Sequence, residues 1–247
     1  MLNPSVVLRG LGILIGVLVL AGIVSMLLEY QFGHPHVQGL VETFSLDGEG
    51  TAGAYFSSIQ LLIAAGLLTV LARAHRDDRR EARYWAVLAV GFFLMSADEA
   101  IGLHEKLAPP VRELLGERAR GVFYFPWVIP AAAGVGALGI YFVPFVLKLP
   151  QPTRAGFVFA GVLFVGGAVV VEALEGRYVE AHGSENLGFH GYVVVEETME
   201  MTGIWVFIRT LLGRLAAVCD TVVVTFRPPA SSDVRVPGEE VIATRGR

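Results

Sequence analysis

Residues 10–28 read GLGILIGVLVLAGIVSMLL and contain no charged side chain. A helix needs about 20 predominantly apolar residues to cross a bilayer. The stretch follows Arg9, as the core of a signal peptide would, but it is too long for one and no small-x-small cleavage site ends it. We therefore expect it to be a transmembrane helix.

The rest of the chain repeats this pattern. Hydrophobic residues make up 54% of the 247 residues and charged residues only 17%, which is too apolar for one soluble core. We predict an all-α integral membrane protein with a six-helix transmembrane bundle at 1–226 and a mobile cytoplasmic tail at 227–247. The spans are expected at about 7–28, 53–73, 84–104, 123–147, 155–176 and 190–213.

Basic residues predict the orientation, because cytoplasmic loops of membrane proteins are rich in Lys and Arg. With six spans, fourteen of the 19 basic residues lie on the side that holds both termini and the loop at 74–83. The loop at 29–52, on the other side, has none. Both termini are thus expected in the cytoplasm of a cell with a bacterial-type cytoplasmic membrane.

Six carboxylates interrupt the apolar stretches, and no Lys or Arg lies within 95–105 or 195–202, where most of them occur. A charge in the hydrocarbon region costs roughly 2.5 to 3.5 kcal/mol, so such a cluster needs protons, water or a cation. The six are Asp98, Glu99, Glu172, Glu196, Glu197 and Glu200.

The predicted topology brings these acids to one outward-facing layer. Asp98 lies roughly 21 Å along the third span, in its outer half, and Glu172 lies near the outer end of the fifth. Helical phase places Glu196, Glu197 and Glu200 on one arc that should face the bundle. By the same phase Asp98 and Glu105 share a stripe, Glu99 and His104 point to either side, and lipid should meet Tyr192, Val195, Met199 and Val206.

Smaller features complete the expected bundle. Small residues in the fifth span, among them Gly156, Gly161 and Gly167, should permit close helix packing. Residues 111–120 are expected to form a short interfacial helix, and prolines should kink the fourth span. The loop at 29–53 could act as a lid or be an ordinary connector.

Short motifs resemble a family of small polytopic bacterial membrane proteins without an assigned function. These are 44–49 (FSLDGE), 96–99 (SADE) followed by His104 and Glu105, and 196–201 (EETMEM). The resemblance covers spans two to six and implies the architecture, but it supplies no reaction.

A divalent-metal site, conceivably in a membrane enzyme, is the first functional hypothesis, because carboxylates and imidazoles from several helices are typical ligands. The Glu-x-x-His pairs of di-metal carboxylate bundles are absent from the spans. The expected cofactor is a divalent cation whose identity the sequence leaves open. Central ligands would be Asp98, Glu196, Glu197 and Glu200, with Glu99, His104, Glu105, Glu172 and His190 as secondary candidates.

Other hypotheses remain open. The protein could be a proton-coupled transporter that uses these acids. It could instead be a structural or assembly subunit of a membrane complex, in which the acids contact a protein partner. For Glu105, Glu172, His104 and His190, simple solvation near a span end competes with a ligand role. A hydrolase using Ser57, Ser58 or Ser96 lacks a supporting histidine pattern, and nucleic-acid motifs are absent. The expected partner is therefore the lipid bilayer, and the sequence does not indicate a substrate.

Overall fold

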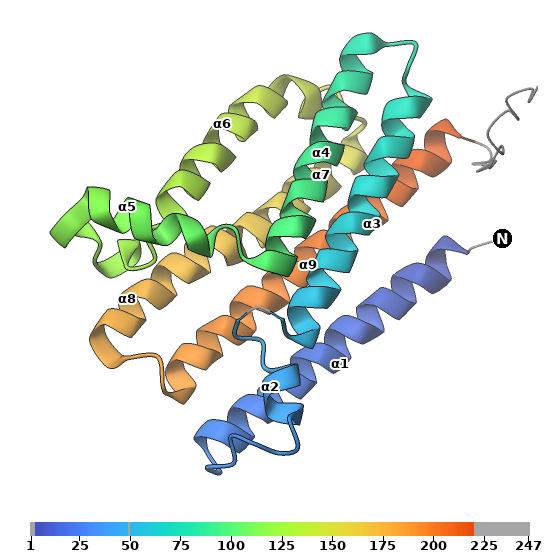
Figure 1. Cartoon of the computed structure of the whole chain (residues 1–247). Coiled ribbons are helices and arrows are strands. Elements are labelled where there is room, and N and C mark those ends of the chain that lie inside the picture. Colours follow the sequence, from blue (N-terminus) through green and yellow to red (C-terminus); the bar gives the residue numbers. More distant parts are fainter. Residues whose placement is uncertain (1–2, 49, 220–247) are drawn as a thin grey trace, which may run out of the picture.

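A computed structural model describes residues 3–48 and 50–219, and all regular secondary structure in these ranges is helical (Figure 1). Six helices are long and apolar enough to cross a membrane. The fifth is continuous but changes type, from an α-helix through a π-helical turn, η4, and back. The six are α1 (Pro4–Tyr30), α3 (Ala52–Ala74), α4 (Arg79–Ile101), α6 (Val128–Val146), α7–η4–α8 (Gln151–Val165, Gly166–Val171, Glu172–His182) and α9 (Leu187–Val218).

The ends of α4 show how local sequence fixes a boundary. Asp78 caps its start by accepting hydrogen bonds from the backbone N–H groups of Arg80 and Glu81, which holds the pKa of Asp78 below its ordinary value. Gly102, with φ of 57°, ends the helix in the left-handed conformation that glycine adopts readily. The expectation that the span runs to residue 104 is therefore wrong.

Short helices and 3-10 turns lie between the long helices. They are α2 (Leu40–Phe44), α5 (Ala108–Leu115) and the 3-10 turns Glu105–Leu107, Gly116–Arg118 and Gly121–Phe123. The predicted helix after the third span is present as α5, which begins three residues earlier because its two prolines fit the first turn. Of the prolines expected to kink the fourth span, only Pro144 lies well inside α6. The predicted tail at 227–247 lies outside the described residues.

Helix α9 forms the centre of the bundle and packs against α1, α3 and α7. Its half from Met201 to Leu215 is buried among apolar side chains, including Leu68 and Leu71 of α3. The other half, nearer its start, carries the glutamates. The bundle thus has a tightly packed apolar end and an end where a cavity separates the helices.

Glycines set the distance between α9 and its neighbour. Gly203 of α9 lies against the backbone of α7, and Gly156 of α7 lies against Thr210. A Cβ added to Gly167 in η4 would lie 2.9 Å from the carbonyl oxygen of Glu196. The predicted close packing is observed at Gly156 and Gly167, whereas a Cβ at Gly161 would meet open space.

Serine side chains join α3 to α4. The Ser58 hydroxyl donates to the Ser96 carbonyl at 2.7 Å, and the Ser96 hydroxyl donates to the Ser58 carbonyl at 2.8 Å. Ser57 is buried and its hydroxyl has no partner. These positions hold two helices together and are not arranged around a histidine.

Candidate functional site, a carboxylate-lined cavity

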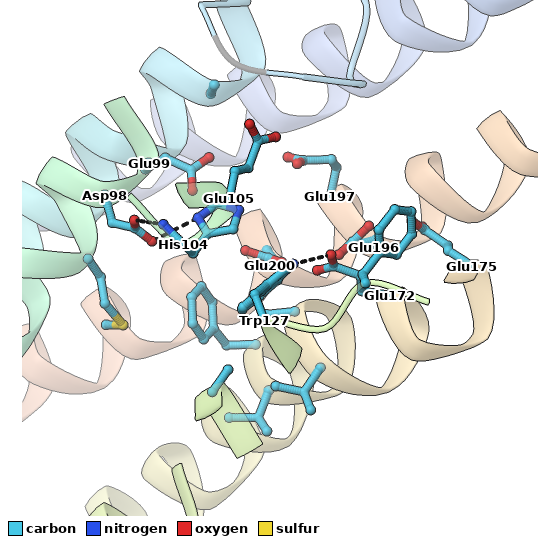
Figure 2. A pocket seen from close by; sticks show the side chains of 18 of the residues that line it. Asp98, Glu99, His104, Glu105, Trp127, Glu172, Glu175, Glu196, Glu197 and Glu200 are labelled. Carbon is cyan, nitrogen blue, oxygen red and sulfur yellow. Dashed lines mark hydrogen bonds and ion pairs between the residues drawn. The ribbon is translucent and has the colours of Figure 1, made fainter. Parts of the chain in front are cut away.

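A cavity of about 690 Å³ lies between α4, α6, η4, α8 and α9 (Figure 2). Within the described residues, nine carboxylate side chains line it and no Lys or Arg does. Three segments far apart in the sequence, together with the loop before α3, supply these acids. They are Asp47, Asp98, Glu99, Glu105, Glu172, Glu175, Glu196, Glu197 and Glu200.

One group in the cavity is the histidine pair, formed by Asp98 and His104. The Asp98 carboxylate accepts the His104 backbone N–H at 2.8 Å and lies 3.0 Å from the imidazole Nδ1. Burial disfavours the charged imidazole, but the hydrogen bond and the charge of Asp98 outweigh it, so the pKa of His104 lies above its ordinary value. The left-handed turn at Gly102 makes this contact possible by reversing the chain after α4.

This geometry corrects two expectations. His104 does not point away from Asp98, and Glu105 does not share a helical stripe with it, because α4 ends at Ile101. Glu105 instead begins a 3-10 turn and still reaches the cavity.

The second group is the glutamate trio, formed by Glu172, Glu175 and Glu196. The Glu196 carboxyl group lies within hydrogen-bonding reach of both Glu172 and Glu175. A carboxylate has no hydrogen to donate, so contacts of this kind require a proton or a cation between the oxygens. Trp127 also donates from its indole Nε1 to Glu172 at 2.5 Å.

Glu197 and Glu200 lie between the histidine pair and the glutamate trio (Figure 2). Both line the cavity together with Glu196, as helical phase predicts. The close approach of Gly167 to α9 brings η4 to within contact of Glu200. A π-helical turn such as η4 often marks a functional position, and here it directly precedes Glu172.

Part of the predicted lipid-facing surface of α9 is wrong. Met199 lies against Gly166 and Gly167, and Tyr192 packs on Tyr178 with ring centroids 5.5 Å apart. Val195 is 50% exposed, in agreement with the prediction. Helical periodicity predicts on which side of α9 these side chains lie, but not whether another helix packs against that side.

His190 is buried but is not among the side chains that line the cavity. It stacks on Tyr30 with centroids 4.3 Å apart, and its Nδ1 lies 3.7 Å from Asp47. Asp47 does line the cavity, and burial raises its pKa despite the opposing effect of His190. The loop before α3 therefore covers one end of the cavity. This loop is the end of the segment at 29–53 for which a lid and an ordinary connector were the two predictions.

Three residues of the candidate site could not be found from the sequence motifs. Glu175 is 3% exposed and belongs to the glutamate trio, and its spacing of three residues from Glu172 could have revealed the shared helical face. Trp127 has no predicted role beyond its place in the span at 123–147, and Asp47 lies in the predicted loop at 29–53. No sequence pattern signals the contact between Trp127 and Glu172, which are 45 residues apart.

The comparisons with known proteins identify a family. The model of a domain of unknown function, DUF8692, matches residues 11–215. The chain belongs to the DUF8692 family. The matched region contains every side chain that lines the cavity, and an uncharacterised family is what the sequence motifs resemble. No curated protein and no solved structure matches the chain.

The acids of this DUF8692 domain do not gather around a single point. Among residues 3–48 and 50–219, no three His, Cys, Asp or Glu side chains are grouped as ligands of a single metal ion. Chemically, the cavity offers a strongly negative environment with one imidazole, His104, on an Asp98 carboxylate. Such an environment favours cations and protons.

Proposed function

We propose that the cavity binds a hard divalent cation. The observation that carries the proposal is that nine carboxylates and no Lys or Arg line one cavity within the described residues. At ordinary ionisation these acids would repel one another strongly in a site with restricted water. A divalent cation relieves that repulsion, and carboxylate oxygens suit Mg²⁺, Mn²⁺ or Ca²⁺.

A hydrated ion fits the spread of the acids. Mg²⁺ usually keeps several waters and contacts only one or two carboxylates directly. Glu197 and Glu200 lie between the other acids, so an ion beside them would also be attracted by the histidine pair and the glutamate trio. Asp98, Glu99, Glu105, Glu172 and Glu196 would then act mainly through charge and bridging water.

The proposal includes an orientation. We place the protein in a bacterial-type cytoplasmic membrane with both termini in the cytoplasm and the cavity facing outward, on the basis of the distribution of Lys and Arg. An Asp47→Cys variant in a Cys219→Ser background tests this. A membrane-impermeant maleimide should label it from outside intact cells, and labelling only after the cytoplasmic side is opened would reverse the orientation.

Metal binding is tested with Mn²⁺ and full-length protein in nanodiscs, followed by electron paramagnetic resonance of the free ion. The double variant Glu197→Gln and Glu200→Gln should weaken binding at least about tenfold, the scale seen on disturbing metal sites. The matched control, Glu113→Gln and Glu117→Gln, removes two exposed acids outside the cavity and should bind like wild type. Equal binding by all three proteins, or none by wild type, would overturn the proposal.

Proton exchange is the second candidate, and the glutamate trio favours it. Hydrogen bonds among Glu172, Glu175 and Glu196 can be completed by protons instead of a metal. Infrared difference spectra of metal-free protein should then show protonated carboxyl bands near neutral pH that Glu172→Gln and Glu175→Gln diminish. Bands that vanish on adding Mn²⁺ would support the cation, and bands that persist would support proton exchange.

A further inference from the structure

The cavity is larger than a hydrated ion requires, and much of its wall is apolar. Its volume of about 690 Å³ falls in the range of sites for drug-sized ligands, about 300 to 1,000 Å³. One face of α6 forms much of this wall, at Pro130, Ala131, Gly134, Val135 and Leu138. The spacing of three and four residues is that of a single helical face, and it runs for roughly 12 Å along the span.

The opposite wall is also apolar. It comes from Met95 in α4, Phe164 and Val165 in α7, and Ala168 and Val169 in η4. The carboxylates from α4, the following turn and α8 lie toward the other end of the cavity, where α4 ends and α8 begins, and those of α9 lie between them. The cavity therefore has an acidic end and a hydrocarbon-like end, which we call the apolar groove.

The apolar groove is open along the side of the bundle. Val135 and Leu138 line it and are 38% and 53% exposed. Helix α6 packs on α4 and α7 through Tyr141, Phe142 and Phe145 near its C-terminal end, beyond the residues that line the groove. In a membrane-spanning bundle, an opening at this level faces lipid, so a hydrocarbon chain could enter sideways.

We propose that the cavity binds a lipid-like amphiphile with an amine head, whose hydrocarbon chain occupies the apolar groove. Charge complementarity selects the head, because nine carboxylates exceed the charge of one divalent cation and would repel a phosphate or carboxylate. Trp127 and Phe125 add aromatic surface at the acidic end, and such rings attract ammonium groups. The proposal goes beyond metal binding and holds with or without an ion beside Glu197 and Glu200.

The experiment compares two photoreactive probes of equal length, a diazirine-bearing dodecylamine and the corresponding dodecanoic acid. Full-length protein in nanodiscs of neutral lipid is irradiated with each probe, and labelled peptides are mapped. We expect the amine to label residues 131–138 and 164–169 at least about tenfold more than the acid does, which corresponds to about 1.4 kcal/mol of discrimination. Equal labelling by the two probes would overturn the proposal.

Two glycine variants test the place of the chain. A Cβ at Gly134 or at Gly136 meets open space, but only Gly134 lines the cavity. Gly134→Phe should fill the apolar groove and abolish labelling by the amine, whereas Gly136→Phe on the same helix should leave it unchanged. Amine labelling that persists in Gly134→Phe would refute binding of the hydrocarbon chain in the apolar groove.

Metal and amphiphile can be separated with the same proteins. Gly134→Phe should retain Mn²⁺ binding, because it changes no carboxylate and lies in the apolar groove. If Gly134→Phe loses both Mn²⁺ binding and amine labelling, and unfolds at a lower temperature than wild type and Gly136→Phe, its bundle is misfolded. The comparison of the amine and acid probes on wild-type protein then decides the proposal. A protein that binds no Mn²⁺ but labels with the amine would refute only the proposed metal function.

Discussion

The indole Nε1 of Trp127 donates a hydrogen bond of 2.5 Å to the carboxylate of Glu172, joining the segment before α6 to the start of α8. The aromatic contacts of α6 with α4 and α7 lie near its C-terminal end, so this bond attaches its N-terminal end. His104 packs on the other side of the same indole, with ring centroids 4.5 Å apart. Trp127 therefore connects the histidine pair to the glutamate trio.

Replacing Trp127 with Phe should loosen α6. A hydrogen bond to a charged group contributes about 1.5 to 3 kcal/mol, so hydrogen exchange across 128–138 should accelerate by about tenfold or more. Trp205→Phe is the matched control, since its indole donates to the Leu8 carbonyl at 2.9 Å and should affect α1 instead. Unchanged exchange in α6 of the Trp127 variant would show that the bond does not hold this helix.

The histidine pair should make stability depend on pH. Because the pKa of His104 is raised in the folded protein, its contribution is fully present below the ordinary histidine value of 6.5 and is lost as pH rises through the folded pKa. Thermal unfolding in detergent should therefore show a decline of about 1 kcal/mol above pH 6.5 in wild type, the size of one hydrogen bond.

The variant His104→Gln should remove that decline. His36→Gln provides a control, because His36 also contacts a carboxylate, that of Glu42, but its side chain is 76% exposed. An exposed pair of this kind contributes little to stability. The idea fails if the pH dependence is the same in His104→Gln as in wild type.

Packing at η4 predicts a sharp difference between two glycines. Gly167→Ala would place a Cβ 2.9 Å from the Glu196 carbonyl oxygen, on backbone that cannot rotate away. We expect a loss of about 1 to 3 kcal/mol, typical of overpacking. Gly161→Ala, whose Cβ meets open space, should be neutral or stabilise by up to about 1 kcal/mol. Chemical unfolding in mixed micelles measures the free energy of unfolding of both variants. Equal changes would contradict the close approach of Gly167 to the Glu196 backbone.

Much of the architecture could be predicted because apolar length and interrupting acids are local features of the sequence. Among the described residues, the six helices that are long and apolar enough to cross a membrane, and the cavity-facing side of Glu196, Glu197 and Glu200, follow from them. The end of α4 was placed three residues too late, because apolar Leu103 follows Gly102, whereas the left-handed backbone at Gly102 ends the helix. That error hid the contact of His104 with Asp98.

The remaining misses have a different physical cause. Trp127 meets Glu172, and Met199 meets Gly167, through contacts between helices whose rotation and separation depend on all neighbours at once. The π-helical turn adds to this, because it changes the phase of every residue after Gly166 relative to a regular α-helix. Helical periodicity read from one segment cannot include these effects.

Serines of α3 and α4 provide a last prediction, in which the loss of two buried hydroxyls should have different effects on stability. Ser96→Ala removes the hydroxyl that donates to the Ser58 carbonyl at 2.8 Å, and should cost about 0.6 to 1.7 kcal/mol, the range for hydrogen bonds between membrane helices. Ser57→Ala removes a buried hydroxyl without a partner and should be neutral or stabilising. Unfolding in mixed micelles measures both. Because each hydroxyl donates to the backbone carbonyl of the other residue, which alanine retains, Ser58→Ala should cost about as much as Ser96→Ala, and most of the two losses should add. A coupling energy in the double-mutant cycle reports only the contact between the two hydroxyls at 3.1 Å. A neutral Ser58→Ala or Ser96→Ala would mean that these hydroxyls do not hold α3 to α4.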